Sequence, residues 1–350
     1  MRGSCFFAQR DIFLAQSRIE RRGSQRQSFL AQSRRERRGS KSNGFLSILC
    51  ESESQNLKIY SLRNSAFSAS LRESLSKLCL LIILFCPLQI HAQRDAQKIG
   101  SLLMEASKLS KGENIPLFFA RKFIGIPYVA HTLEVNDDER LVVNTRQLDC
   151  TTFVETVTAL TLCVYNKEYS YDAYLRHLQN MRYREGRIED YTSRIHYFTE
   201  WIVENQRAGI VKEIQAPNPP FTAIQTVKVN YMSRHPQSYK ALKAHPEYVP
   251  AISKMEKSLT GKKFRYIPKA QIGDSKAMRE AVHDGDIIAI TCNKPGLDIA
   301  HLGFAVWHKD GLHLLNASQI HKKVIDEPMT LREYLKKHPS HTGIRIVRIK

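Results

Sequence analysis

The sequence predicts an α+β fold, with helices in the first part of the folded region and an antiparallel sheet in the last part. Apolar residues recur at helical spacing from Phe153 to Val164, which predicts a helix that begins near Asp149 or Cys150. Four short β-rich runs, each bounded by Gly, Asp or Asn, cover residues 283–292, 300–308, 311–318 and 343–350. This order, helices before strands, is typical of the α+β class.

The remaining elements follow from the same kinds of pattern. Residues 95–125 are expected to be helical, and 125–145 to form a turn and a β-hairpin around Asp137 and Asp138. Two further helices are expected over 169–186 and 192–209, and a Pro-rich run then marks a break. The region of about 210–280 is less regular, and we expect it to be an insertion that shapes a cleft.

The first 70 residues do not look like a folded domain. FLAQSRIERRGS (13–24) recurs as FLAQSRRERRGS (29–40), and Ser-rich sequence follows. Two copies are too few for a stacked repeat architecture, which needs about three. We expect residues 1–70 to be disordered low-complexity sequence, or sequence upstream of the true start. A basic tail that binds anionic lipid or nucleic acid is the alternative.

Residues 71–92 show the order of basic, apolar and small-residue regions that is typical of a secretory signal. The apolar run from Leu78 to Phe85 is too short to cross a bilayer as a helix, and a cleavage point follows at Ala92. A core helix is the alternative. We expect export to the periplasm or cell envelope, no stable membrane insertion after cleavage, and a single catalytic domain over 93–350.

The chain is basic, with 53 Lys and Arg against 34 Asp and Glu. The region 94–350 carries a net charge of +10, which suits an anionic polymer. No dense Lys/Arg stripe interleaved with aromatic residues occurs, so we expect no nucleic-acid partner. No HExxH or CxxC pattern occurs, and strand alternation separates His301 from His308, so we expect no metal and no other cofactor.

One cysteine stands apart from the others. In RQLDCTTFVETVTAL (146–160), Cys150 lies at the expected helix start, where unpaired N–H groups and the helix dipole favour the thiolate. Signal removal would leave Cys150, Cys163 and Cys292, an odd number, so at least one thiol is unpaired or bonded to another chain. Cys163 and Cys292 suit core positions, and the sequence leaves open whether they form a disulfide with each other. Cys150 is the candidate nucleophile.

A cysteine nucleophile needs an imidazole to take its proton and a third group to hold that imidazole. His301 opens a strand run 151 residues after Cys150, a separation that is typical of the papain-like arrangement. The turn at 309–311 makes this run and the next one a hairpin, which brings Asn316 near His301 as the orienting group. His313, taken to share the face of Asn316 on that strand, is the rival third residue.

The motifs DCTTFVE, GDIIAI, HLGFAV and LLNAS, in this order, resemble those of the NlpC-type cysteine hydrolases of bacterial cell walls. In that family a papain-like helix packs on an antiparallel sheet. GIPY resembles the superfamily's GxPY turn, and SRIHYFTEW, GLDIAHLGFAV and LREYL resemble most the branch described as N-acetylmuramoyl-L-alanine-amidase-like. The resemblance covers roughly 97–350. NTRQLDC replaces the family's GG-x-D run, and LNAS replaces IHAS, which leaves the third residue less certain than the first two.

The resemblance implies an exported cysteine amidase whose partner is peptidoglycan or a muropeptide, with the N-acetylmuramoyl–L-alanine amide as the first choice of bond. Cys150 would attack the carbonyl, and His301 would accept and return the proton. The Cys150 N–H would help to hold the oxyanion, and Tyr128 would lend its hydroxyl to the thiol or to the tetrahedral intermediate. Further candidate substrate contacts are Asp298, Arg194 and His196.

Several alternatives remain open from the residues alone. The same machinery could cut the γ-D-glutamyl–diaminoacid bond of the stem peptide, and a metal-dependent amidase or a catalytically inactive wall-binding module are further readings. Tyr128 could be a packing residue at a turn, and Asp298 could orient its own loop. An exposed helix face would explain Arg194 and His196.

Overall fold

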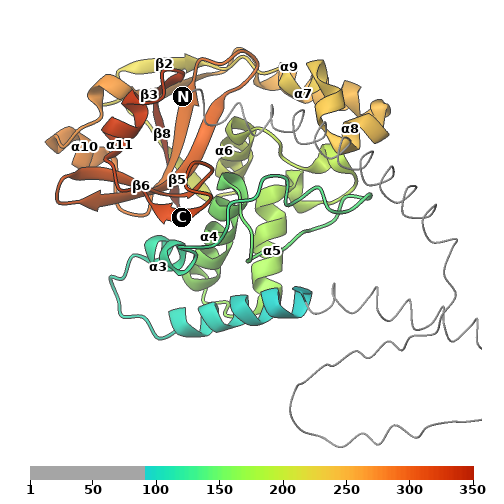
Figure 1. Cartoon of the computed structure of the whole chain (residues 1–350), viewed down its shortest axis with the longest axis horizontal. Helices are drawn as coiled ribbons and strands as arrows, with labels where there is room; N and C mark the ends of the chain where they lie inside the picture. The colour runs from blue at the N-terminus through green and yellow to red at the C-terminus, as the bar shows by residue number, and fades with distance from the viewer. Residues whose placement is uncertain (1–90) are drawn as a thin grey trace, which may run out of the picture. The chain divides into compact units, whose positions relative to one another are not determined.

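The centre of the fold is an antiparallel sheet, and helices cover both of its faces (Figure 1). The computed structural model describes residues 91–350, so the repeats and nearly all of the expected export signal lie outside the described residues. Residues 92–350 belong to one compact unit. The α+β class with an antiparallel sheet is confirmed. Among the described residues, no helix combines the length and apolar character needed to span a bilayer.

The eight strands are joined in the order β2-β3-β8-β4-β5-β6-β7, and β1 also pairs with β8. The strands are β1 (Val211–Ile214), β2 (Ala223–Thr226), β3 (Lys263–Pro268), β4 (Ile287–Cys292), β5 (Ile299–His308), β6 (Gly311–Ser318), β7 (Lys323–Asp326) and β8 (His341–Ile349). All four strand runs predicted in the C-terminal part are confirmed as β4, β5, β6 and β8. The expected hairpin of β5 and β6 is confirmed by the pairing of His308 with Gly311.

A helix that includes residues 91–106 precedes the helices that surround the sheet. These are α3 (Ile115–Lys122), α4 (Cys150–Tyr165), α5 (Tyr171–Arg182), α6 (Phe198–Arg207), α7 (Tyr231–Arg234), α8 (Lys240–Ala244), α9 (Val249–Leu259), α10 (Lys276–Ala281) and α11 (Leu331–Lys336). The helices α3 to α6 pack on one face of the sheet, and α10 and α11 on the other. Both faces of the central strands are therefore covered, which explains why every residue of β4 and β6 is buried.

Helix α4 is fixed against β5 by aromatic contacts. Phe153 lies edge-on to Phe304 of β5, with ring centroids 5.5 Å apart, and edge-on to Phe123 at 6.4 Å. Such pairs add about 0.5–1.5 kcal/mol to the free energy gained by burying the rings. Because Phe153 lies one helical turn from the start of α4, this packing also fixes the position of Cys150 relative to β5.

The prediction of a β-hairpin around Asp137 and Asp138 is wrong, because no strand forms over 129–147. The backbone carbonyls of this segment accept hydrogen bonds from side chains at the C-terminal end of α5, and not from a paired strand. Arg182 donates to the carbonyl of Val142 at 2.6 Å, and the Tyr183 hydroxyl donates to the carbonyl of Arg140 at 3.1 Å.

The region expected to be an insertion at about 210–280 contributes to the sheet. Strands β1 and β3 both pair with β8, and β2 pairs with β3. The helices α7 and α9 of this region pack into a separate apolar cluster with Tyr191 and Tyr197. Since Tyr191 and Tyr197 flank the segment before α6, this cluster supports one side of the site described next.

Candidate active site

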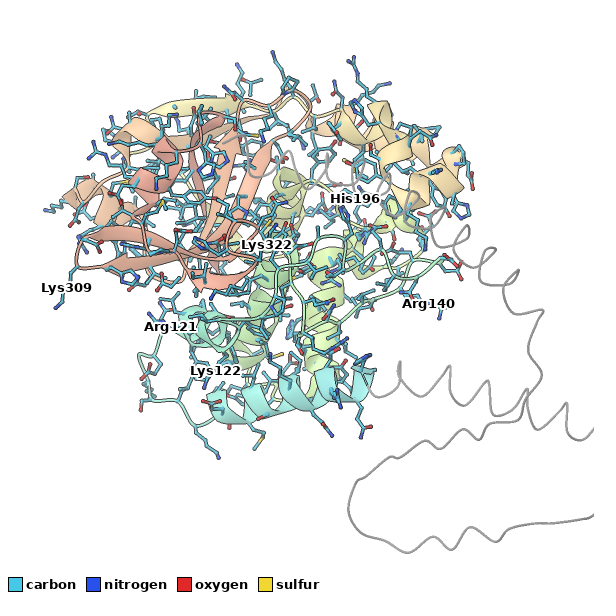
Figure 2. The ribbon with its side chains drawn as sticks, viewed as in Figure 1. Arg121, Lys122, Arg140, His196, Lys309 and Lys322 are labelled. Atoms are coloured by element: carbon cyan, nitrogen blue, oxygen red, sulfur yellow. The ribbon has the colours of Figure 1, made fainter. Side chains whose placement is uncertain are left out.

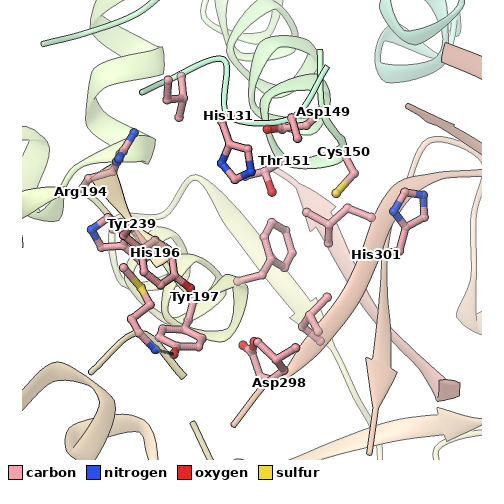
Figure 3. A pocket seen from close by; sticks show the side chains of 18 of the residues that line it. His131, Asp149, Cys150, Thr151, Arg194, His196, Tyr197, Tyr239, Asp298 and His301 are labelled. Carbon is pink, nitrogen blue, oxygen red and sulfur yellow. Dashed lines mark hydrogen bonds between the residues drawn. The ribbon is translucent and has the colours of Figure 1, made fainter. Parts of the chain in front are cut away.

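A pocket of about 300 Å³ lies where the start of α4, the start of β5 and the segment before α6 meet. Six of the seven predicted site residues line it, namely Tyr128, Cys150, Arg194, His196, Asp298 and His301. Figure 3 shows Cys150 and His301 at one end of this pocket and Arg194 and His196 at the other. The structure thus brings together residues that are up to 173 positions apart in the sequence.

The start of α4 is set by a reciprocal cap. Asp149 is the N-cap residue, and its carboxylate accepts from the backbone N–H of Thr152 at 2.8 Å. The Thr152 hydroxyl accepts in turn from the backbone N–H of Asp149 at 2.9 Å. Cys150 is therefore the first residue of the helix, as predicted, and its own N–H belongs to the first turn, where helical N–H groups have no intrahelical acceptor.

The helix start favours the thiolate of Cys150, but the surroundings of the thiol act against it. Burial, and then the neighbouring charge of Asp149, raise the pKa of the Cys150 thiol to about 12. Hydrogen bonds from the Leu302 backbone and the Thr151 side chain act in the opposite direction but are weaker. The thiol is therefore protonated at neutral pH, and a nearby base has to remove its proton when it reacts.

His301 lies next to this thiol. The sulfur of Cys150 is hydrogen-bonded by the backbone of Leu302, the residue that follows His301 on β5. Figure 3 shows the Cys150 side chain and the His301 ring beside one another, one from α4 and the other from β5. His301 is buried, so water competes little for its ring nitrogens.

Asn316 fixes the tautomer of His301. Nε2 of His301 lies 2.9 Å from Oδ1 of Asn316, and Nδ2 of Asn316 donates to the carbonyl of Leu314 at 3.1 Å. Because a carbonyl only accepts, the amide nitrogen must face Leu314 and the amide oxygen must face His301. Nε2 therefore carries the hydrogen, and in the neutral ring Nδ1 is the atom that can accept a proton.

Gly303 permits the contact between His301 and Asn316. A Cβ atom at position 303 would lie 2.7 Å from the carbonyl oxygen of Leu315 and 2.9 Å from Cβ of Asn316. Real Cβ contacts are longer than this, so any other residue would push β6, and Asn316 with it, away from β5. The close approach of β5 and β6 thus explains why a glycine stands at this position of the HLGFAV motif.

His313 does not compete for the third position. It lies three residues from Asn316, an odd offset that places the two side chains on opposite faces of β6, so the expectation of a shared face is wrong. Nδ1 of His313 lies 2.8 Å from the carbonyl oxygen of Glu327, and its Nε2 lies 3.0 Å from Oδ1 of Asp310.

Replacing Asn316 by alanine should lower kcat by about 10- to 100-fold, because an imidazole without its orienting partner spends less time in the productive pose. The Asn316→Gln variant keeps the amide but displaces it by one methylene. Its kcat should lie between those of Asn316→Ala and wild type. Steady-state rates with a muropeptide, the substrate that the resemblance implies, check this. An unchanged kcat in Asn316→Ala would remove Asn316 from the site.

Replacing Asp149 by asparagine should make the Cys150 thiol more reactive. Asparagine caps a helix about as well as aspartate, so α4 should keep its start while a charge that raises the Cys150 pKa is lost. The rate of carboxamidomethylation of Cys150 at pH 8, followed by peptide mapping, should rise on the order of tenfold, the effect of one pKa unit. An unchanged or lower rate would show that the Asp149 charge does not influence the thiol.

Arg194 and His196 do not lie on a helix face, because α6 begins only at Phe198 and both precede it in an extended segment. Arg194 is buried, and its guanidinium lies 2.5 Å from Glu134 and 3.6 Å from Glu139. Burial alone would lower the Arg194 pKa, but these carboxylates outweigh it and raise the pKa. Arg194 therefore builds the pocket wall together with Glu134.

His196 is a neutral imidazole. Its Nε2 lies 2.8 Å from the carbonyl oxygen of Tyr191, so Nε2 carries the hydrogen. Burial, and then the charge of Arg194, lower the His196 pKa well below its ordinary value. A neutral ring of this tautomer offers its Nδ1 to a donor group in the pocket.

Asp298 orients its loop, one of the two readings that the sequence left open. Its carboxylate accepts from the backbone N–H of Thr199 at 2.7 Å and so caps α6, and its carbonyl accepts from the Gln225 side chain at 2.7 Å. The same residue lines the pocket. It thus ties the start of β5, and with it His301, to α6.

Tyr128 lies next to the nucleophile's segment. Residues 127–129 exchange backbone hydrogen bonds with Leu148, in which Leu148 donates to Pro127 and Val129 donates to Leu148, both at 3.1 Å. Tyr128 is half-buried and lines the pocket. This places the GIPY turn beside Cys150, as the resemblance implied.

The sequence analysis missed a ring cluster behind the base. Tyr334 of α11 stacks on His301 with centroids 6.4 Å apart, and His341 stacks on Tyr334 at 6.1 Å. Burial lowers the pKa of His341 to about 3 and also lowers the pKa of His338. Both rings are neutral at neutral pH, so they place no positive charge behind a His301 imidazolium. No local pattern in LREYL signals this contact.

Cys150, Cys163 and Cys292 are all free thiols in the described part of the chain, so the bond left open between Cys163 and Cys292 is absent there. Within residues 91–350, the side chains that could bind a metal ion together lie around His308, away from this pocket.

A family model described as AmiA-like, N-acetylmuramoyl-L-alanine amidase-like, matches residues 118–344. A comparison with curated proteins found no significant match. Among solved structures, an N-acetylmuramoyl-L-alanine amidase from Bacteroides uniformis is 41% identical, with 69% of this chain and 100% of that chain covered and a TM-score of 0.64.

Two further structures are similar. A protein from Bacteroides fragilis, described as a candidate xylanase, is 43% identical over 66% of this chain and 98% of its own, with a TM-score of 0.62. A protein from Legionella pneumophila is 22% identical over 75% of this chain and 96% of its own, with a TM-score of 0.57. The last similarity concerns the fold alone.

Proposed function

This chain belongs to the N-acetylmuramoyl-L-alanine amidase-like family, and from this premise we propose that it is a cysteine amidase of papain-like, NlpC-type design. Its substrate is the amide between N-acetylmuramic acid and L-alanine in peptidoglycan or in muropeptides. The family supports an amide hydrolase that acts on the cell wall. The cysteine mechanism rests on the residues of the pocket.

The single observation that carries the mechanism is the arrangement of Cys150, His301 and Asn316. A thiol at a helix start lies beside an imidazole whose Nε2 is held by an amide oxygen at 2.9 Å. That hydrogen bond leaves Nδ1 as the proton acceptor, which a thiol with a pKa of about 12 requires.

The reaction then proceeds in two halves. His301 takes the Cys150 proton as the sulfur attacks the lactyl carbonyl of the muramic acid, and the backbone N–H of Cys150 stabilises the oxyanion. The imidazolium returns its proton to the departing nitrogen of L-alanine, which leaves a thioester on Cys150. Water, deprotonated by His301, hydrolyses the thioester and restores the thiol. Tyr128 is the proposed second donor to the oxyanion.

A glycosidase, as the Bacteroides fragilis neighbour's description would suggest, is less well supported. Such enzymes use two carboxyl groups on either side of the scissile bond. The pocket carboxylates are engaged elsewhere, since Glu134 pairs with Arg194, Asp149 caps α4 and Asp298 caps α6.

Digestion of purified peptidoglycan, with mass spectrometry of the products, tests the proposal. Intact stem peptides with a free L-alanine amine, together with glycan that carries free lactyl groups, are the expected products. Stem peptides cut after D-glutamate would indicate the γ-D-glutamyl–diaminoacid endopeptidase. No release from either bond would contradict the amidase and favour a wall-binding module.

Export is part of this proposal, because the polymer lies outside the cytoplasm. The order of basic, apolar and small residues in 71–92 motivates it. N-terminal sequencing of the protein recovered from the periplasm of an expressing bacterium should give a start near residue 93. A start at or before residue 71 in that fraction would contradict the cleavage.

A further inference from the structure

A second group of reactive side chains lies around the turn between β5 and β6. His308 ends β5, His313 lies on β6 and Asp326 ends β7. One ligand atom from each lies within 4.8 Å of the others. The nucleophile, base and orienting amide of the pocket include none of them.

His313 is oriented as a metal-ligating histidine is. It is buried, and its Nδ1 lies 2.8 Å from the carbonyl oxygen of Glu327, which can only accept, so Nδ1 carries the hydrogen. Nε2 points at Oδ1 of Asp310 from 3.0 Å. In a neutral ring this would set a lone pair against a carboxylate oxygen. A metal ion on Nε2 would resolve that repulsion.

A ring N–H that donates to a backbone carbonyl is the usual outer support of a histidine bound to a metal, because it fixes the ring and raises the basicity of the other nitrogen. The support of His313 is present without any metal and comes from a buried carbonyl at the end of β7. The imidazole is therefore already in the pose that coordination through Nε2 requires.

The other ligands converge on the same place. The His308 and His313 rings lie 4.3 Å apart between centroids, and Nε2 of His308 lies 3.1 Å and 3.2 Å from the two carboxylate oxygens of Asp326. A tetrahedral zinc with bonds of about 2.0–2.1 Å sets its ligand atoms about 3.3 Å apart. The separations between His308 and Asp326 are already close to that value.

The group is open to solvent and remote from the pocket. His308 is exposed, and Figure 2 shows Lys309, the next residue, at the outer edge of the molecule with its side chain pointing away. His301 and His308 are seven residues apart on one strand, about 23 Å, and their odd offset places them on opposite faces. A metal here could not take part in the reaction at Cys150.

We propose that His308, His313 and Asp326 form a binding site for a divalent transition-metal ion of the zinc type, with a fourth position open to water. Imidazole nitrogens select such ions over Mg²⁺, and the Asp326 carboxylate offsets part of the charge of a divalent ion. The ion would tie the edge strand β7 to the β5–β6 turn across β6. The site is independent of the proposed amidase activity, and the sequence analysis did not predict it because Asp326 carries no motif.

The test uses the full chain without a histidine tag, freed of metal by chelation and titrated with Zn²⁺ by calorimetry and against a chromophoric chelator. We expect one tight site per chain, no comparable binding of Mg²⁺, and a rise of Tm with Zn²⁺. His308→Ala and Asp326→Asn should each weaken binding by about 10- to 100-fold or more and abolish the rise of Tm. His245→Ala removes an exposed histidine from another part of the chain and is the matched control.

Co²⁺ gives a second readout, since four N and O ligands in tetrahedral geometry produce intense visible bands, which should disappear in His308→Ala. Binding of equal strength in His308→Ala, Asp326→Asn and wild type would overturn the proposal, as would the absence of a stoichiometric site.

Discussion

The Cys150→Ala variant should fold and yet release no stem peptide above the background, a loss of at least about 10⁴-fold in kcat. In the proposed mechanism the sulfur is the attacking atom, and no other described thiol lines the pocket. The variant removes one atom at a half-buried position, so circular dichroism and Tm should stay close to wild type. Cys150→Ser should be nearly as inactive, because a hydroxyl is a poorer nucleophile for a histidine base.

Cys163→Ala is the matched control, since Cys163 is a free thiol on the same helix but is buried in the core. It should cost stability through the cavity that it leaves, while its rate per folded molecule stays unchanged. Substantial release by Cys150→Ala, with Cys163→Ala also active, would refute a thiol mechanism.

The second large effect is expected for His301→Ala, which should lower kcat by about 10²- to 10⁴-fold through loss of the general base. The pH dependence should also change. Without a base, the rate follows the thiolate fraction of Cys150, which grows tenfold per pH unit below a pKa of about 12. The residual rate should therefore climb steadily between pH 7 and 10.

Rates of wild type, His301→Ala and the exposed control His283→Ala across that range check this expectation. His283→Ala should keep the wild-type profile. A flat profile in His301→Ala would mean that another group takes the thiol proton.

The sequence was sufficient where the determining interactions are local. Asp149 and Thr152 lie three residues apart and cap α4 reciprocally, so the helix start at Cys150 could be predicted from a short window. The strands β4 to β6 follow from their β-rich runs and turn residues. With the hairpin predicted, the proximity of His301 and Asn316 followed from pairing alone.

The sequence was insufficient where partners lie far apart along the chain. The helix over 198–207 starts later than predicted because Asp298, 99 residues away, caps it. Arg194 is buried because Glu134, 60 residues away, compensates its charge. The raised pKa of Cys150 has the same kind of cause, since tertiary burial outweighs the local effect of a helix start.

The most direct measurement traps the intermediate. Wild-type enzyme and a defined disaccharide-pentapeptide are mixed, quenched in acid within milliseconds, digested and mapped by mass spectrometry. We predict that the peptide containing Cys150 gains the mass of the disaccharide lactyl acyl group, and that Cys150→Ala gains nothing. An adduct that also contains L-alanine and D-glutamate, or full turnover with no adduct on Cys150 at any quench time, would contradict the account.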